Sequence, residues 1–136
     1  MFALIRHGAY SIYPDHLTPE GEGMVLALAE RLAALQAWTR ICASPRIRTQ
    51  ETAAIIGRVL SLPVELDESL LETASHDAWM PPHDLSEGTI LVTHVPVIRE
   101  IGNAWAKHFQ VSAPPTVGVS EGLLIDPRAS TIKKIS

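Results

Sequence analysis

The stretch that decides the fold is the first ten residues, MFALIRHGAY (Met1–Tyr10). An apolar run, Phe2–Ile5, stops at the polar triplet Arg6-His7-Gly8. This pattern predicts a buried strand that ends in a loop, at the edge where open α/β sheets bind ligands. The arginine suits phosphate or carboxylate, and the histidine can be a nucleophile, a base or a cation near neutral pH. Taken alone, the triplet is explained equally well by a purely structural strand end whose histidine is hydrogen-bonded.

Composition limits the classes of protein to which the chain can belong. Its 136 residues, 46% hydrophobic and 19% charged, fit one globular domain over residues 1–136. The net charge of −4 argues against nucleic acid and anionic membranes as partners. The single cysteine, Cys42, excludes an internal disulfide framework and fits a reducing compartment. With no signal-like or membrane-spanning run, the expected location is cytoplasmic.

Apolar periodicity then predicts the order of the elements. Residues 18–36 predict a helix because Thr18 suits the N-cap, Pro19 suits the first helical position and apolar residues follow at helical spacing. The remaining expectations are a strand at 40–43, a helix to about 60, a strand at 63–67, a loop at 68–88, a strand at 89–94 with a helix after it, and a hairpin or edge strands at 117–126 and 130–136. This β-α-β-α-β order predicts an α/β fold, a three-layer sandwich with a mostly parallel central sheet.

Arginine and histidine side chains follow three of the predicted strands. Arg6 and His7 end the first, Arg46 and Arg48 follow the second at the start of a helix, and His94 ends the strand at 89–94. In a parallel sheet these ends lie on one edge, so the arginines and histidines can converge. Each residue has an ordinary structural explanation, but their coincidence at three strand ends predicts a phosphate site.

Four separated segments carry a resemblance to a known family. They are LIRHG (4–8), LTPEGEG (17–23), ASPRIRTQETA (43–53) and LVTHVPV (91–97). Their order and spacing resemble the histidine phosphatase superfamily, which has the phosphoglycerate mutase-like fold. The resemblance implies that His7 is phosphorylated and that Arg6, Arg48 and His94 bind the phosphate with it.

Two features of the sequence indicate the branch of the family that the chain resembles. Residues 61–88 are too few for the helical cap of the mutases and larger phosphatases, and His94-Val95-Pro96 resembles the small SixA-like phosphohistidine phosphatases. Three features depart from the family pattern. The asparagine that follows the first motif in the mutases is absent, Glu51 stands where many members have glutamine, and Arg46 stands where many have leucine.

The mechanism that the resemblance implies is covalent and needs no metal or other cofactor. Neutral His7 attacks phosphorus while a backbone acceptor holds its other ring nitrogen. Arg6, Arg48 and a protonated His94 stabilise the transferring phosphoryl group, and water hydrolyses the phosphohistidine. The substrate would be a phosphorylated small molecule or a phosphohistidine protein.

A proton donor is expected near the third predicted strand. Glu72 lies near the family's position for the acid that protonates the leaving group, although it fits a solvated loop carboxylate equally well. Asp77 and His76 are the next candidates for this acid. A phosphohistidine substrate needs no acid from the enzyme.

Three alternatives remain beside the histidine mechanism. Cys42 and Arg48 have the C-x5-R spacing of cysteine-dependent phosphatases, but the segment between them lacks glycine and contains Pro45. A metal site could use the loop residues His76, Asp77, His83 and Asp84, whose spacing matches no defined site. The third alternative is a phosphoryl-binding module that uses the same pocket without turnover. The sequence leaves the oligomeric state open.

Overall fold

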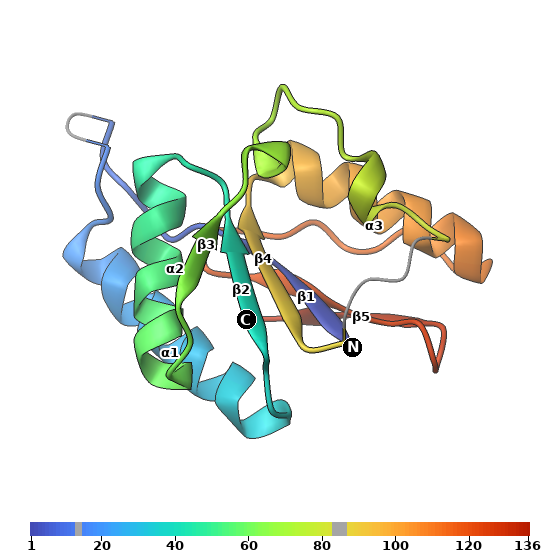
Figure 1. The fold of residues 1–136 in the computed structure, drawn as a ribbon, viewed down its shortest axis with the longest axis horizontal. Helices are drawn as coiled ribbons and strands as arrows, with labels where there is room; N and C mark the ends of the chain where they lie inside the picture. Colours follow the sequence, from blue (N-terminus) through green and yellow to red (C-terminus); the bar gives the residue numbers. More distant parts are fainter. Residues whose placement is uncertain (13–14, 83–86) are drawn as a thin grey trace.

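The computed structural model describes residues 1–12, 15–82 and 87–136, and Figure 1 shows their arrangement around one sheet. The strands are β1 (Phe2–Arg6), β2 (Arg40–Ala43), β3 (Val64–Leu66), β4 (Thr89–Thr93), β5 (Gly122–Asp126) and β6 (Thr131–Ile135). The helices are α1 (Pro19–Leu35), α2 (Ile47–Leu60) and α3 (Val95–Phe109), with short 3₁₀ helices η1 (Glu68–Leu70) and η2 (Asp77–Trp79). The strand order is β3-β2-β4-β1-β5-β6.

The sheet is parallel at its centre and antiparallel at one side. β3, β2, β4 and β1 run parallel, while β5 is antiparallel to β1 and β6 is antiparallel to β5. Helices α1 and α2 cover one face and α3 covers the other, which gives the predicted three-layer α/β sandwich (Figure 1). No helical cap is present in the described part of the chain. The predicted fold class is therefore confirmed.

Alternation along the strands divides the core between these layers. In β1, Ala3 and Ile5 pack with α1 and α2, whereas Phe2 and Leu4 pack with α3. Strand β4 lies between β2 and β1, and all five of its residues are buried. A strand buried on both faces has the near-continuous apolar sequence seen in Thr89–Thr93.

Two of the predicted elements differ in detail. The strand expected at 117–126 begins at Gly122, because Ser120 takes a left-handed backbone (φ 57°) and donates its N–H to the His7 carbonyl. β5 is interior, so only β6 of the hairpin is an edge strand. The long loop at 68–88 contains η1 and η2.

Sheet register brings the polar strand ends together. Arg6 pairs with Thr93 across β1 and β4, and Ala43 pairs with Val92 across β2 and β4. The residues that follow these neighbouring strands, His7, Ser44 and His94, therefore emerge at one edge.

A close backbone approach fixes the loop that follows β1. The Thr18 side chain caps α1 by accepting from the Gly21 N–H (3.0 Å), and the Thr18 N–H donates to the Ala9 carbonyl (3.0 Å). A Cβ at position 21 would lie 2.2 Å from the Ala9 oxygen, so only glycine fits there. The first turn of α1 thus holds the backbone two residues after His7. In the described residues, no helix has the length and apolar character needed to cross a bilayer.

Candidate active site

His7 is buried and held by the backbone around it. Its Nδ1 lies 3.0 Å from the Gly8 carbonyl oxygen, and the Gly8 N–H donates to Thr52 Oγ1 (3.0 Å). A carbonyl can only accept, so Nδ1 carries the proton and Nε2 has the free lone pair in the neutral ring. This is the backbone acceptor and the tautomer that a nitrogen nucleophile needs.

The surroundings of His7 favour its neutral form. Burial lowers the pKa of the imidazole, and the positive charges of Arg48 and Arg6 lower it further, against the opposing effect of the Gly8 carbonyl. His7 is only 4% exposed. At neutral pH the ring is therefore uncharged and available for nucleophilic attack.

The two predicted arginines approach His7 from different elements. Arg48, in the first turn of α2, pairs with Asp15 (3.3 Å), and its guanidinium lies 4.8 Å from the centre of the Tyr10 ring. Arg6, the last residue of β1, donates from Nη1 to the Val117 carbonyl (3.2 Å).

Three buried nitrogens around His7 lack a hydrogen-bond partner among the described residues. They are Nε of Arg6, Nε of Arg48 and Nδ1 of His94. Unpaired buried polar groups are rare in folded proteins and cost free energy, so each requires an explanation. A phosphoryl group, with several acceptor oxygens, would supply partners to the two guanidiniums.

His94 is oriented by a chain of hydroxyl groups. Its Nε2 lies 2.7 Å from Ser44 Oγ, which lies 2.8 Å from Thr49 Oγ1. Thr49 Oγ1 is also 2.7 Å and 2.8 Å from the carbonyl oxygens of Ser44 and Arg46, which can only accept. The Thr49 hydroxyl therefore donates to the backbone, Ser44 donates to Thr49, and His94 Nε2–H donates to Ser44.

The charge of His94 differs from the prediction. Burial lowers the pKa of His94 to about 4, and the opposing charge of Glu72 does not offset burial together with Arg48, His7 and Arg46. The prediction of a protonated His94 is thus wrong. The ring centres of His94 and His7 lie 5.6 Å apart, so His94 remains beside the nucleophile.

Glu72 lies inside the same cluster. Its carboxylate is 3.4 Å from His94 Nε2, 3.6 Å from Arg46 Nε and 3.7 Å from Arg48 Nη2. Burial acts to raise the pKa of Glu72, but its own backbone N–H and the neighbouring His94, Arg46 and Arg48 outweigh burial and lower it. Glu72 is therefore a carboxylate beside the guanidiniums of Arg46 and Arg48.

Two departures from the family pattern now have structural partners. Glu51 accepts from the Leu17 N–H (2.8 Å) and lies 3.1 Å from His16 Nδ1, so it ties the loop after β1 to α2. Arg46 precedes α2 and pairs with Glu72.

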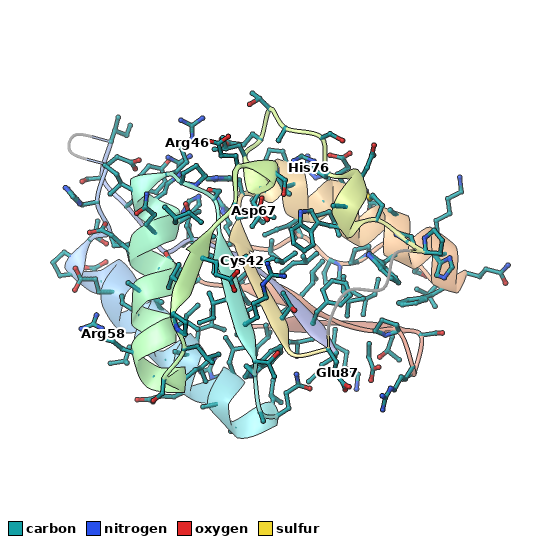
Figure 2. The ribbon with its side chains drawn as sticks, viewed as in Figure 1. Cys42, Arg46, Arg58, Asp67, His76 and Glu87 are labelled. Carbon is teal, nitrogen blue, oxygen red and sulfur yellow. The ribbon has the colours of Figure 1, made fainter. Side chains whose placement is uncertain are left out.

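The cysteine site and the metal site considered as alternatives are less favourably arranged for catalysis. Cys42 is buried within β2, and burial raises the pKa of its thiol to about 11. Figure 2 shows Cys42 away from the end of the sheet where Arg46 and His76 lie. Of the proposed metal ligands, His76 is engaged by Glu100 and Leu71, whereas His83 and Asp84 lie outside the described residues. No metal-binding cluster of His, Cys, Asp and Glu occurs within residues 1–12, 15–82 and 87–136.

Sequence reasoning did not anticipate the groups that support these side chains. They are Asp15 and Tyr10 beside Arg48, Thr52 beneath Gly8, and Ser44 with Thr49 behind His94. Ser44, Thr49 and Thr52 all belong to the quoted segment ASPRIRTQETA, so three hydroxyls in one motif were the available signal.

A central parallel sheet with two arginines and two histidines at one end of its strands is the arrangement expected of a histidine phosphatase-like protein. The family model described as "Histidine phosphatase superfamily (branch 1)" matches residues 2–85, which is more than half of the chain. The chain therefore belongs to the histidine phosphatase superfamily, which confirms the resemblance. His94 lies beyond the matched residues.

Solved structures have the same fold at low sequence identity. The protein histidine phosphatase SixA complexed with tungstate is 19% identical, with a TM-score of 0.71 and coverage of 99% of this chain and 94% of that one. A Plasmodium falciparum phosphoglycerate mutase is 21% identical (TM-score 0.65, coverage 99% and 87%). A mycobacterial glucosyl-3-phosphoglycerate phosphatase is 17% identical (TM-score 0.64, coverage 98% and 95%). No curated protein matched the sequence.

Proposed function

We propose that this protein is a phosphatase that forms a covalent phosphohistidine on His7. The observation that carries the proposal is the His7 tautomer, with Nδ1 donating to the Gly8 carbonyl and Nε2 left with a lone pair. Membership of the superfamily supports this function. The reaction transfers a phosphoryl group first to nitrogen and then to water.

In the first step His7 Nε2 forms a bond to phosphorus, and the bond from phosphorus to the leaving group breaks. The guanidiniums of Arg6 and Arg48 stabilise the charge on the phosphoryl oxygens, and their unpaired Nε groups supply donors. An alkoxide leaving group needs a proton, which Glu72 would donate. Glu72 must be protonated for this step, and a bound dianion favours that form because it competes with the carboxylate for Arg48.

In the second step water attacks the phosphohistidine and the bond between nitrogen and phosphorus breaks. Glu72, now a carboxylate beside His94, can accept the proton from the attacking water. Inorganic phosphate leaves and neutral His7 is regenerated. Both steps use only side chains of this chain, and the charge that a metal would supply comes from the arginines.

The substrate is a phosphomonoester or a protein phosphohistidine. The described residues place no helical cap over the site, which leaves room for a protein side chain, and the fold similarity to SixA supports phosphohistidine. A cavity of about 180 Å³ adjoins the site, since Val95 and Val117 in its lining neighbour His94 and Arg6. It can hold a compact organic group. The reduced Cys42 supports the cytoplasmic location that the sequence predicts.

The test is to trap the phosphoenzyme with an aryl phosphate and assay turnover in matched variants. His7→Ala should abolish both turnover and the acid-labile phosphoenzyme, while Cys42→Ser and the exposed control His108→Ala should retain them. Activity should survive exhaustive chelation. Loss in Cys42→Ser with retention in His7→Ala would contradict the proposal, and phosphate binding without turnover in the unmodified protein would identify a binding module. A panel with phosphohistidine peptide and sugar phosphates then identifies the substrate.

A further inference from the structure

His76 has an unusual environment for a residue that the mechanism above does not use. Its ring is 4% exposed and lies between η1 and α3. Nδ1 is 2.6 Å from Glu100 Oε2, and Nε2 is 2.8 Å from the Leu71 carbonyl oxygen. Both ring nitrogens are thus engaged by other groups at short distances.

The partners of His76 are both hydrogen-bond acceptors. A carboxylate oxygen of Glu100 lies at Nδ1 and the Leu71 carbonyl oxygen lies at Nε2. Because both ring nitrogens are engaged and a ligating nitrogen needs its lone pair, His76 cannot serve as a metal ligand in this arrangement.

The acceptor in this contact belongs to the peptide unit that begins Glu72. The carbonyl of Leu71 and the N–H of Glu72 are two ends of one planar group. That N–H bonds to the Glu72 carboxylate and helps to lower its pKa. One residue earlier, the Leu70 carbonyl accepts from Thr93 Oγ1 at 2.6 Å, next to His94. Successive carbonyls before Glu72 are thus fixed to groups beside the active site.

We propose that His76, held by Glu100 of α3, is a positioning residue that fixes the Leu71–Glu72 peptide and so places the Glu72 carboxylate beside His94. The ring joins the Glu72 segment to the helix that begins next to His94. The placement of Glu72 by His76 rests on hydrogen-bond geometry. The effect of that placement on catalysis rests on the proposed function.

Other contacts keep the segment folded without His76. Trp79 Nε1 donates to Ser69 Oγ (3.0 Å), and Trp105 Nε1 donates to the Trp79 carbonyl (2.9 Å). Leu70 is fully buried in the core beneath α3. Replacing His76 should therefore leave the segment attached to the core while freeing the peptide before Glu72.

The experiment combines a double-mutant cycle with a direct observation of Glu72. His76→Leu should lower kcat for an alkyl phosphate by about 10- to 100-fold through misplacement of the acid, with KM changed less than about twofold. Phosphorylation of His7 by an aryl phosphate, measured in a single turnover, needs no acid and should be spared. In a Glu72→Gln background the same change should have no further effect on kcat. His76→Gln, which keeps one donor, should recover part of the rate.

A carboxyl-detected NMR titration supplies a readout that does not depend on activity. In His76→Leu the pKa of Glu72 should rise above that of the unmodified protein, because the carboxylate loses its fixed backbone donor. The surface partner variant Glu100→Gln should cause a smaller rise in the same direction.

Several results would overturn the inference. One is a Glu72 titration that does not move in His76→Leu. Another is equal slowing of single-turnover His7 phosphorylation by alkyl and aryl phosphates, and the last is an undiminished effect of His76→Leu in the Glu72→Gln background. If the unmodified protein does not label His7 with aryl phosphate, the proposed function fails separately, and the titration alone then decides the positioning claim.

Discussion

Removing one hydroxyl behind His94 tests whether the chain of hydrogen bonds orients the second histidine. Ser44 is fully buried, and its Oγ contacts both His94 Nε2 (2.7 Å) and Thr49 Oγ1 (2.8 Å). Ser44→Ala removes both hydrogen bonds and leaves a buried imidazole N–H without its acceptor. A lost hydrogen bond costs about 1 kcal/mol and an unsatisfied buried donor costs about 1–3 kcal/mol. We expect the free energy of unfolding to fall by about 2–3 kcal/mol.

Turnover should fall as well, because the His94 ring is free to rotate. His94 neighbours His7 and Glu72, so Ser44→Ala should cost less than the loss of a transition-state donor, which lowers kcat by about 10²–10³-fold. Urea unfolding and kcat on an aryl phosphate measure the two effects. Ser120→Ala is the matched control, since Ser120 is 3% exposed and its hydroxyl has no partner among the described residues. Equal stability and turnover in the two variants would refute the hydrogen-bond chain.

Three further predictions address charge and packing. Arg48→Ala should lower kcat by about 10²–10³-fold, whereas Arg46→Ala should cost less than about tenfold, because the Arg46 side chain is 48% exposed and the Arg48 side chain is 16% exposed; equal kinetic losses would contradict these roles. The pKa of His94 is about 4 in the folded protein against 6.5 ordinarily, so the unfolded chain binds more protons between these values. The free energy of unfolding should therefore fall as pH falls from 6.5 toward 4. In His94→Gln, the free energy measured by urea unfolding should depend less steeply on pH. An equal pH dependence in both proteins would reject this assignment. In α1, Gly21→Ala should destabilise by about 3 kcal/mol or more through collision with Ala9. Gly23→Ala, with no atom within 4 Å of the new Cβ, should stabilise by up to about 1 kcal/mol, and similar melting temperatures would disprove the close approach.

The sequence predicted those parts of the site that follow from strand ends. Arg6, His7 and His94 follow apolar runs, and a parallel sheet must bring such ends together. Arg48 was predicted by its place at the start of a helix after the neighbouring strand. The site geometry places all four near one another, while their roles in catalysis stay predictions.

The parts that were not predicted depend on contacts between distant residues. The hydrogen bond between Ser44 and His94 joins positions fifty residues apart, and no local pattern indicates it. The charge of His94 was predicted wrongly because burial, which dominates its pKa, depends on tertiary packing. The two 3₁₀ turns at 68–70 and 77–79 are too short to produce a periodic signal.

The carboxylates of Glu72 and Asp15 are counter-ions to Arg48 from within the same chain. Each lies within 4 Å of Arg48, so any anion that enters must compete with groups tethered at high effective concentration. A monoanion such as chloride or acetate brings a single charge to compete with these two tethered carboxylates. A phosphoryl dianion carries twice the charge and several acceptor oxygens, and it can also satisfy the unpaired nitrogens. We therefore expect these internal counter-ions to favour doubly charged ligands over small monoanions.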